Sequence, residues 1–145
     1  MRFLLIVALA AAGYGSYQWW QQRGSDVDGT GGAQATASAN GFVPVLMPSG
    51  VPRNVVLILA PPNCPSDQAQ RSEALVAELE RSGIPVRRGS GFSFDLEAPT
   101  AEQRAGVDRA IQVFKRGAPA VFVNGMAMSN PSPAQAIAEY QRTRR

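Results

Sequence analysis

Apolar and polar residues are distributed unevenly along the chain, and their pattern divides it into three parts. Residues 3–12 form an unbroken apolar run. Residues 24–41 are rich in Gly, Ala, Ser, Thr and Asp, a composition too polar and too flexible to fold alone. In residues 42–145, apolar positions recur at the spacings of strands and helices. We therefore expect an N-terminal segment (1–23), a flexible linker (24–41) and one folded domain (42–145).

The N-terminal segment has the features of a membrane anchor. Its apolar run follows Arg2, and Trp19 and Trp20 stand where an interfacial aromatic belt belongs. A cleavable signal peptide is the alternative, because the run is short and small residues such as Ala10 lie near its end. Since Arg2 is the one charge before the run, the positive-inside tendency exports the domain. In a bacterium, as the Ala- and Arg-rich composition suggests, we expect a single-pass inner-membrane protein facing the periplasm, or a periplasmic protein after cleavage.

The folded domain begins with a buried strand and a helix. The run 55–60 is apolar on both faces, which is typical of a strand covered from both sides. Between residues 68 and 82, four residues recur at helical spacing, and they are Ser72, Leu75, Val76 and Leu79. Gly83 ends this helix, and a second extended segment begins at Ile84 and could continue to Phe94.

The second half of the domain predicts a helix, a hairpin and a final helix. Thr100 and Gln103 form a capping-box signature, and the face predicted to enter the core carries Val107, Ala110, Ile111 and Phe114. The Asn124-Gly125 pair is a strong hairpin signal between strands at 120–123 and 126–128. A second capping box, from Ser132 to Gln135, begins the last helix. This order predicts an α/β fold, with a central four-stranded mixed sheet flanked by helices on both faces.

Composition excludes several classes of function. The formal net charge is only +3, and cationic and acidic residues are interspersed, so we expect no nucleic-acid binding. The chain has no histidine and a single cysteine. Catalysis by histidine, a Cys/His metal site and an intramolecular disulfide are therefore excluded, and we expect no bound metal.

Two separated motifs resemble the thioredoxin superfamily, and its glutaredoxin-like branch in particular. Cys64-Pro65-Ser66-Asp67, between the first strand and its helix, is similar to the Cys-x-x-Cys site of the family with its first cysteine kept. Residues 117–125 resemble its loop, strand and hairpin containing a cis-proline. The resemblance implies a thioredoxin-like fold.

The same resemblance implies two groups of site residues. The catalytic residues would be Cys64, Pro65 and Asp67. The substrate-binding residues would be Ala118, Pro119 and Ala120. We expect the Ala118-Pro119 peptide bond to be cis and to lie beside Cys64, where an extended substrate could pair with the backbone.

The chain departs from the family pattern at positions that matter for chemistry. Asp67 stands where the second cysteine belongs, so Cys64 has no internal resolving thiol. The positions that bind glutathione in glutaredoxins are occupied here by Pro61, Ser129-Asn130 and Pro133. We therefore expect no cofactor, and glutathione is the alternative that the resemblance leaves open.

Two functions agree with these residues. A helix N-terminus at Cys64 would favour the thiolate, although the negative charge of Asp67 opposes it. The first function is a membrane-tethered monothiol protein in thiol–disulfide chemistry, with protein or peptide substrates that carry thiols or disulfides. The second is a redox-inactive binding module of an envelope assembly, such as a secretion or conjugation apparatus. Whether the protein is an enzyme, a monothiol disulfide oxidoreductase, depends on the reactivity of Cys64.

Overall fold

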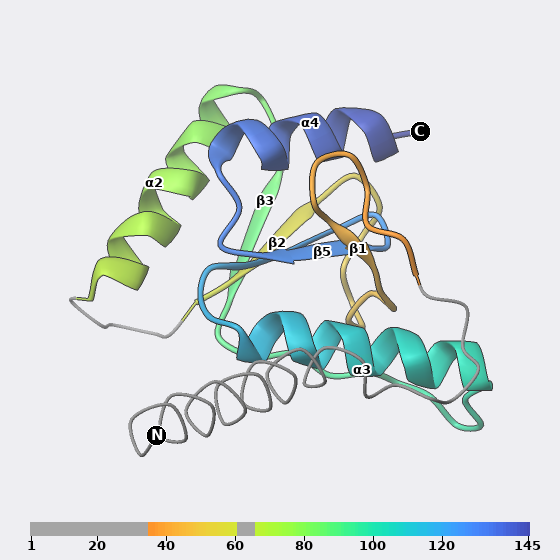
Figure 1. Cartoon of the computed structure of the whole chain (residues 1–145). Helices are drawn as coiled ribbons and strands as arrows, with labels where there is room; N and C mark the ends of the chain where they lie inside the picture. The colour runs from red at the N-terminus through yellow and green to blue at the C-terminus, as the bar shows by residue number, and fades with distance from the viewer. Residues whose placement is uncertain (1–34, 61–65) are drawn as a thin grey trace, which may run out of the picture. The chain divides into compact units, whose positions relative to one another are not determined.

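The computed structural model of the protein describes residues 35–60 and 66–145 (Figure 1). These residues cover the end of the predicted linker and nearly all of the predicted folded domain. The predicted membrane segment, most of the predicted linker, and the predicted site residues Cys64 and Pro65 lie outside the described residues.

The described residues form one mixed sheet in the order β1-β5-β4-β2-β3. Its strands are β1 (Val43–Pro44), β2 (Val56–Leu59), β3 (Val86–Gly89), β4 (Ala120–Val123) and β5 (Met126–Ser129). The β2 and β3 strands are parallel, and the other neighbours are antiparallel. The predicted α/β class with a mixed sheet is confirmed, but the described sheet has five strands and not four. The additional strand is β1, in which Val43 and Pro44 pair with Ala127 and Met126 at the sheet edge.

Three helices surround this sheet in the described part of the chain: α2 (Asp67–Arg81), α3 (Ala101–Lys115) and α4 (Pro133–Thr143). Both predicted capping boxes are present, at the starts of α3 and α4. The N-cap of α2 is Ser66, whose hydroxyl oxygen accepts a hydrogen bond from the backbone N–H of Ala69 at 3.4 Å. Asp67 is therefore the first residue of α2, one position before the predicted start at residue 68.

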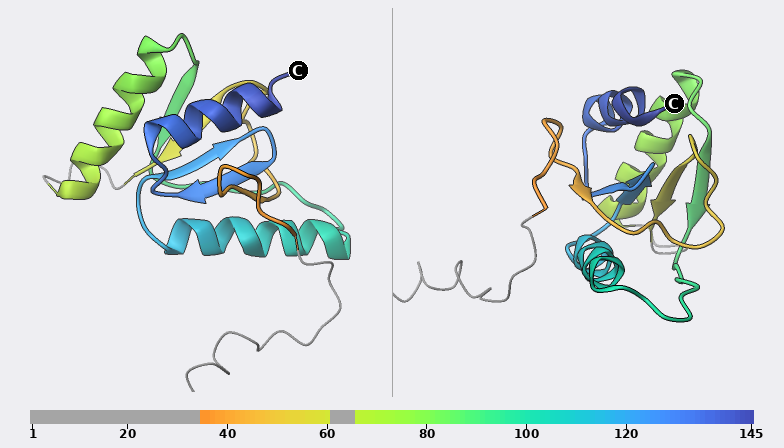
Figure 2. Two further views of the ribbon diagram at one scale, coloured as in Figure 1. Left: turned by 45° about the horizontal axis from the view of Figure 1, so that its top comes forward. Right: turned by 90° about the vertical axis from the view of Figure 1, so that its right-hand side faces the viewer.

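The sheet separates two clusters of buried side chains, one on each face. The α2 and α4 helices cover one face, and α3 covers the other (Figures 1 and 2). Successive side chains of β2 alternate between the faces. Val56 and Ile58 belong to the cluster under α2 and α4, whereas Leu57 and Leu59 belong to the cluster under α3. This arrangement explains why the whole of β2 is apolar and buried.

Helix α2 faces the core with the predicted residues, whereas α3 does so only in part. The buried residues of α2 are the four predicted ones, Ser72, Leu75, Val76 and Leu79. In α3 the buried residues are Gly106, Ala110 and Val113, and Phe114, predicted to be in the core, is 38% exposed. Of the predicted face, Ala110 is buried, Val107 and Ile111 are half-buried, and Phe114 is exposed, so the prediction is confirmed at Ala110 and wrong at Phe114.

The close packing of α3 against the segment after β1 depends on Gly106. The backbone N–H of Leu46 donates a hydrogen bond to the carbonyl oxygen of Gly106 at 3.2 Å. A Cβ atom at position 106 would lie 2.9 Å from the Leu46 nitrogen, so only glycine permits this approach without displacement. The segment that follows β1 thus packs directly on the α3 backbone.

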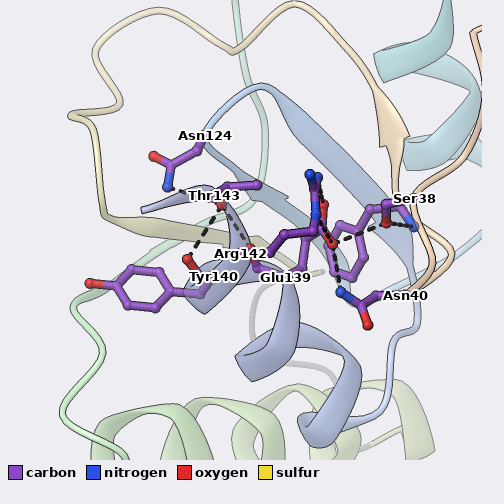
Figure 3. Close-up of polar contacts among 8 residues, drawn as sticks. Ser38, Asn40, Asn124, Glu139, Tyr140, Arg142 and Thr143 are labelled. Carbon is purple, nitrogen blue, oxygen red and sulfur yellow. Dashed lines mark hydrogen bonds and ion pairs between the residues drawn. The ribbon is translucent and has the colours of Figure 1, made fainter. Parts of the chain in front are cut away.

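A buried carboxylate joins the start of the described chain to α4. Glu139 has no exposed surface, and its carboxylate accepts hydrogen bonds from Ser38 Oγ at 3.0 Å and Asn40 Nδ2 at 2.8 Å, as well as two from the Arg142 guanidinium (Figure 3). We call these four residues the Glu139 cluster. Burial raises the pKa of the Glu139 carboxyl, but the hydrogen bonds from Arg142, Asn40 and Ser38 outweigh burial and lower the pKa below its ordinary value.

The Glu139 cluster holds residues 38–41 in a turn. The composition of these residues places them in the predicted linker. Within residues 38–41, the Gly41 N–H donates to the Ser38 carbonyl oxygen at 2.9 Å. The Ser38 N–H donates to the carbonyl oxygen of Phe42, whose side chain is fully buried against the sheet. Among the described residues, contacts with the folded domain are therefore already present at Ser38.

Candidate functional site

Four of the predicted site residues lie in the described part of the chain, and they come from two neighbouring places. Asp67 begins α2, which follows β2 in the sequence. Ala118 and Pro119 form the loop between α3 and β4, and Ala120 begins β4 opposite Leu59 at the end of β2. The structure thus brings the 118–120 loop to the same end of the sheet at which β2 ends.

The Ala118-Pro119 peptide bond is cis, as predicted. The side chain of Pro119 is almost fully buried. The Pro119 carbonyl oxygen accepts a hydrogen bond from the Asn130 N–H at 2.7 Å, and the Ser129 hydroxyl donates to the Gly117 carbonyl oxygen at 2.8 Å. Ser129, at the end of β5, and Asn130, the next residue, therefore hold the two ends of the 117–119 loop. The predicted proximity of Pro119 to Cys64 lies outside the described residues.

Glycine at position 117 shapes the entry to this loop. Helix α3 ends at Lys115, and Gly117 has a φ of 131°, a conformation that side chains rarely adopt. The Gly117 N–H donates to the carbonyl oxygen of Phe114 at 3.4 Å. The chain thus leaves the helix and turns at once toward β4.

A small apolar groove lies beside this loop, and we call it the Ala118 groove. Its volume is about 390 Å³. Eight residues line it: Leu59, Ala60, Gln68, Ser90, Phe114, Gly117, Ala118 and Ala120. They come from the end of β2, the first turn of α2, the residue after β3, the end of α3 and the loop into β4. None of them carries a charge, so contacts in this groove are made through apolar surface and neutral hydrogen-bonding groups.

The backbone of Ala118 has a hydrogen-bond donor and an acceptor that no other described residue uses. Neither its N–H nor its carbonyl oxygen makes a hydrogen bond with another described residue. Both neighbours, Gly117 and Pro119, have their carbonyl oxygens bonded to the end of β5. Ala118 can therefore offer a donor and an acceptor to an extended chain laid in the groove, in the manner of an added β-strand.

The positions that the resemblance associates with glutathione have structural roles here. The Ser129 hydroxyl and the Asn130 N–H hold the 117–119 loop, and Pro133 is the first residue of α4. Pro61 lies outside the described residues. Nor does any group of His, Cys, Asp and Glu side chains suited to a metal ion occur in residues 35–60 and 66–145.

Sequence reasoning misses most of the groove lining. It places Phe114 in the core, because its spacing from Val107 and Ala110 fits one helical face. In the structure Phe114 packs edge-on against Phe92, with ring centroids 5.2 Å apart, and one side of it faces the groove. An aromatic residue in the last turn of a helix, directly before the Gly117-Ala118-Pro119 loop, is the signal that could have identified it.

Comparison with known proteins adds no assignment. Scans against models of protein families, against curated proteins and against solved structures found no match to the chain. Within the described part of the chain, no helix has the length and apolarity to cross a membrane.

Proposed function

We propose that the protein is a thioredoxin-like, monothiol protein of thiol–disulfide chemistry, in which the Ala118 groove receives an extended peptide beside Cys64. The observation that carries the proposal is the location of this groove. Ala60, the last described residue before Cys64, and Gln68, in the first turn after it, both line the groove. Cys64 is two residues from Ser66 in the sequence, and two residues span about 7 Å of extended chain at most.

The fold supports the proposal at a coarser level. The order of elements is the one that the resemblance implies, namely strand, helix, strand, helix, hairpin and helix. A cis peptide bond precedes the hairpin strands, at the position that the resemblance implies. The additional strand β1 lies at the far edge of the sheet, beyond β5. It leaves the β2 end and the 118–120 loop unobstructed.

The reaction that these residues would perform is a single thiol–disulfide exchange. The Cys64 thiolate attacks one sulfur of a substrate disulfide, a new S–S bond forms, and the second substrate sulfur leaves as a thiolate that takes up a proton. Asp67 has no sulfur with which to resolve this mixed disulfide. A thiol from a second molecule must therefore release the substrate.

A binding module without redox activity is the second candidate. The lining of the Ala118 groove supports it, because none of the described lining residues has a cationic side chain that could stabilise a thiolate. The groove and the backbone of Ala118 would still bind an extended peptide. The two candidates thus share a ligand class and differ in the reactivity of Cys64.

The rate of alkylation of Cys64 in the full chain, measured against pH, separates the two candidates. The first predicts a thiol pKa below the value of about 8.5 for a free cysteine, and Asp67→Asn should lower it further by removing a nearby negative charge. Glu73→Gln, which removes an exposed carboxylate elsewhere on α2, is the matched control and should leave the pKa unchanged. A Cys64 pKa at or above that of a free thiol would favour the binding module.

A resolving thiol at position 67 tests the chemistry directly. Wild-type protein should retain a mixed disulfide until an external thiol is added, whereas Asp67→Cys should release the substrate and turn over in a disulfide-reductase assay. The double variant Cys64→Ser, Asp67→Cys controls for a reaction begun at the new cysteine. Unaided cycling of the wild type would contradict the monothiol mechanism.

We also propose that residues 1–23 stay attached and place the domain in the periplasm. The support is the sequence pattern of Arg2, the apolar run and the tryptophan pair. Mass spectrometry of the mature protein should find the intact N-terminal segment. A new N-terminus near Ala11 or Gly13 would show instead that the segment is a cleaved signal peptide.

A further inference from the structure

A second, larger groove lies at the other end of the sheet. It has a volume of about 720 Å³, and we call it the Arg53 groove. Its walls are the segment from β1 to β2, the β4–β5 turn and the end of α4. Because Asn54 precedes β2 and Asn124 follows β4, this groove and the Ala118 groove lie at opposite ends of these two strands.

Hydrogen bonds among side chains form one wall of the Arg53 groove. The Asn54 N–H donates to Asn124 Oδ1 at 2.8 Å, and Asn124 Nδ2 donates to Asn54 Oδ1 at 3.2 Å. Asn124 Nδ2 also donates to Thr143 Oγ1 at 3.2 Å (Figure 3). These bonds tie the loop before β2, the β4–β5 turn and the end of α4 together. The groove is therefore preformed and does not depend on a ligand for its shape.

The charged side chains among the described residues that line the Arg53 groove are all cationic. Arg53, Arg142 and Arg145 contribute guanidinium groups, and no described Asp or Glu lines the groove. The main-chain oxygen of Arg145 accepts a hydrogen bond from Asn54 Nδ2 at 3.1 Å. Arg142 is oriented by its bonds to the buried Glu139, whereas Arg53 and Arg145 form no salt bridge with another described residue. The rim thus provides guanidinium donors that suit an anionic group.

The interior of the groove is apolar and uses flexible side chains. Val45, Met47, Val51 and Met126 contribute its apolar surface. Methionine side chains adapt to ligands of irregular shape. A ligand that satisfies both parts of this groove needs an apolar body and one anionic end.

We propose that the Arg53 groove binds a small amphipathic carboxylate, with its apolar body on Met47 and Met126 and its carboxylate on Arg53 and Arg145. The proposal is independent of the function proposed for the Ala118 groove, because the two grooves share no lining residue. It assigns a binding site to the end of the sheet that thiol chemistry would not use.

The test is titration of the full chain, carrying ¹³C-methyl methionine, with 4-phenylbutyrate, and with 4-phenylbutyramide as the uncharged control of the same body. Met47 and Met126 line the groove and Met128 does not, so the first two methyl signals should shift saturably while that of Met128 stays in place. The amide should bind about tenfold more weakly, the loss expected for one charge-assisted contact of about 1.4 kcal/mol.

Two exposed arginines provide matched variants. Arg53→Gln should weaken binding of 4-phenylbutyrate about fivefold, and Arg145→Gln should do the same. Arg71→Gln, on the exposed side of α2 and outside the groove, should leave the affinity unchanged. Circular dichroism would verify that each variant is folded.

Several outcomes would overturn the proposal. These are equal affinity for the acid and the amide, equal affinity of the Arg53 and Arg71 variants, and shifts that include Met128 or spare Met47 and Met126. A second copy of the chain could instead fill the groove. In that case sedimentation would show self-association, the shifts of the Met47 and Met126 methyl signals would change with protein concentration, and 4-phenylbutyrate would have no effect. That result would replace the small carboxylate by a self-association surface.

Discussion

At the Arg53 end of the sheet, side-chain hydrogen bonds add to a backbone bond from the Val45 N–H to the Gly125 carbonyl oxygen, whereas at the Ala118 end most of the described bonds between loops are backbone bonds. Asn54, Asn124 and Thr143 form a network of side-chain contacts at the first end. At the second end, the Asn130 N–H bonds to the Pro119 carbonyl oxygen and the Ala60 N–H bonds to that of Gly89. A single side-chain hydroxyl, from Ser129, adds to these.

Because of this difference, the two ends of the sheet suit different kinds of ligand. Where side chains satisfy the loops, the outward-facing groups are arginine side chains, which suit an anion. At the Ala118 end, small residues leave an apolar surface, and the Ala118 backbone makes no hydrogen bond with another described residue, an arrangement that suits an extended chain. The difference also predicts that stability depends more strongly on individual side chains at the Arg53 end.

Replacement of Glu139 by Ala should have the largest effect. It removes the acceptor of Ser38, Asn40 and Arg142 and leaves polar groups without partners in a buried place, so the free energy of unfolding should fall by about 2–4 kcal/mol. Glu139→Gln keeps the size and one acceptor and should cost about half as much. Urea denaturation of both variants measures the loss. Glu78→Gln, in an exposed pair with Arg81, is the control and should change stability by less than about 0.5 kcal/mol.

The Glu139 contribution should also depend on pH in a defined direction. Because the pKa of the Glu139 carboxyl is lowered in the folded state, its stabilisation is present above the ordinary value of 4.5 and is lost as pH falls through the lower folded-state pKa. The difference in unfolding free energy between wild type and Glu139→Gln should therefore shrink below pH 4.5. A difference that stays constant from about pH 6 to about pH 3 would contradict this assignment.

Two asparagines, one at each end of the sheet, allow the two ends to be compared directly. Asn124 and Asn130 both have positive φ, 47° and 50°, so glycine fits either backbone without strain. Only Asn124 uses its side chain for hydrogen bonds with other described residues. Asn124→Gly should cost about 1–2 kcal/mol in unfolding free energy, and Asn130→Gly less than about 0.5 kcal/mol. Similar losses in thermal or urea denaturation would remove the distinction between the two ends.

Ser129→Ala should have the smallest effect of these substitutions at bonded side chains. It removes the hydrogen bond to the Gly117 carbonyl oxygen, which is part-buried, and should cost about 0.5–1 kcal/mol. Ser93→Ala, whose hydroxyl bonds to no other described residue, is the matched control. A loss of more than about 2 kcal/mol on urea denaturation would mean that this end also depends on a side chain.

Features whose partners are close in sequence can be predicted. Both capping boxes join residues three positions apart, so the pattern alone identifies the starts of α3 and α4. The continuous apolar run predicts the buried strand β2, and residue spacing predicts the α2 face. The cis-proline loop follows from the resemblance and from its place before a hairpin.

Features whose partners are distant in sequence could not be predicted. The two-residue strand β1 exists only through its pairing with β5, more than eighty residues away. Gly106 carries no hydrophobic signal, although its lack of a Cβ permits the close approach of Leu46 to α3. A glutamate such as Glu139 normally indicates an exposed position, and Ser38 and Asn40, about a hundred residues earlier, alter that. In the candidate site, the sequence predicts the loop 118–120 but not Phe114.

The turn of residues 38–41 also determines how the domain would respond to a pulling force. A force applied to the chain before Ser38 would first meet the bonds to Glu139 and the buried ring of Phe42. Neither residue lines the Ala118 groove. We therefore expect a force on the preceding segment to act on α4 and on the face of the sheet that α4 covers. The Ala118 groove should keep its shape.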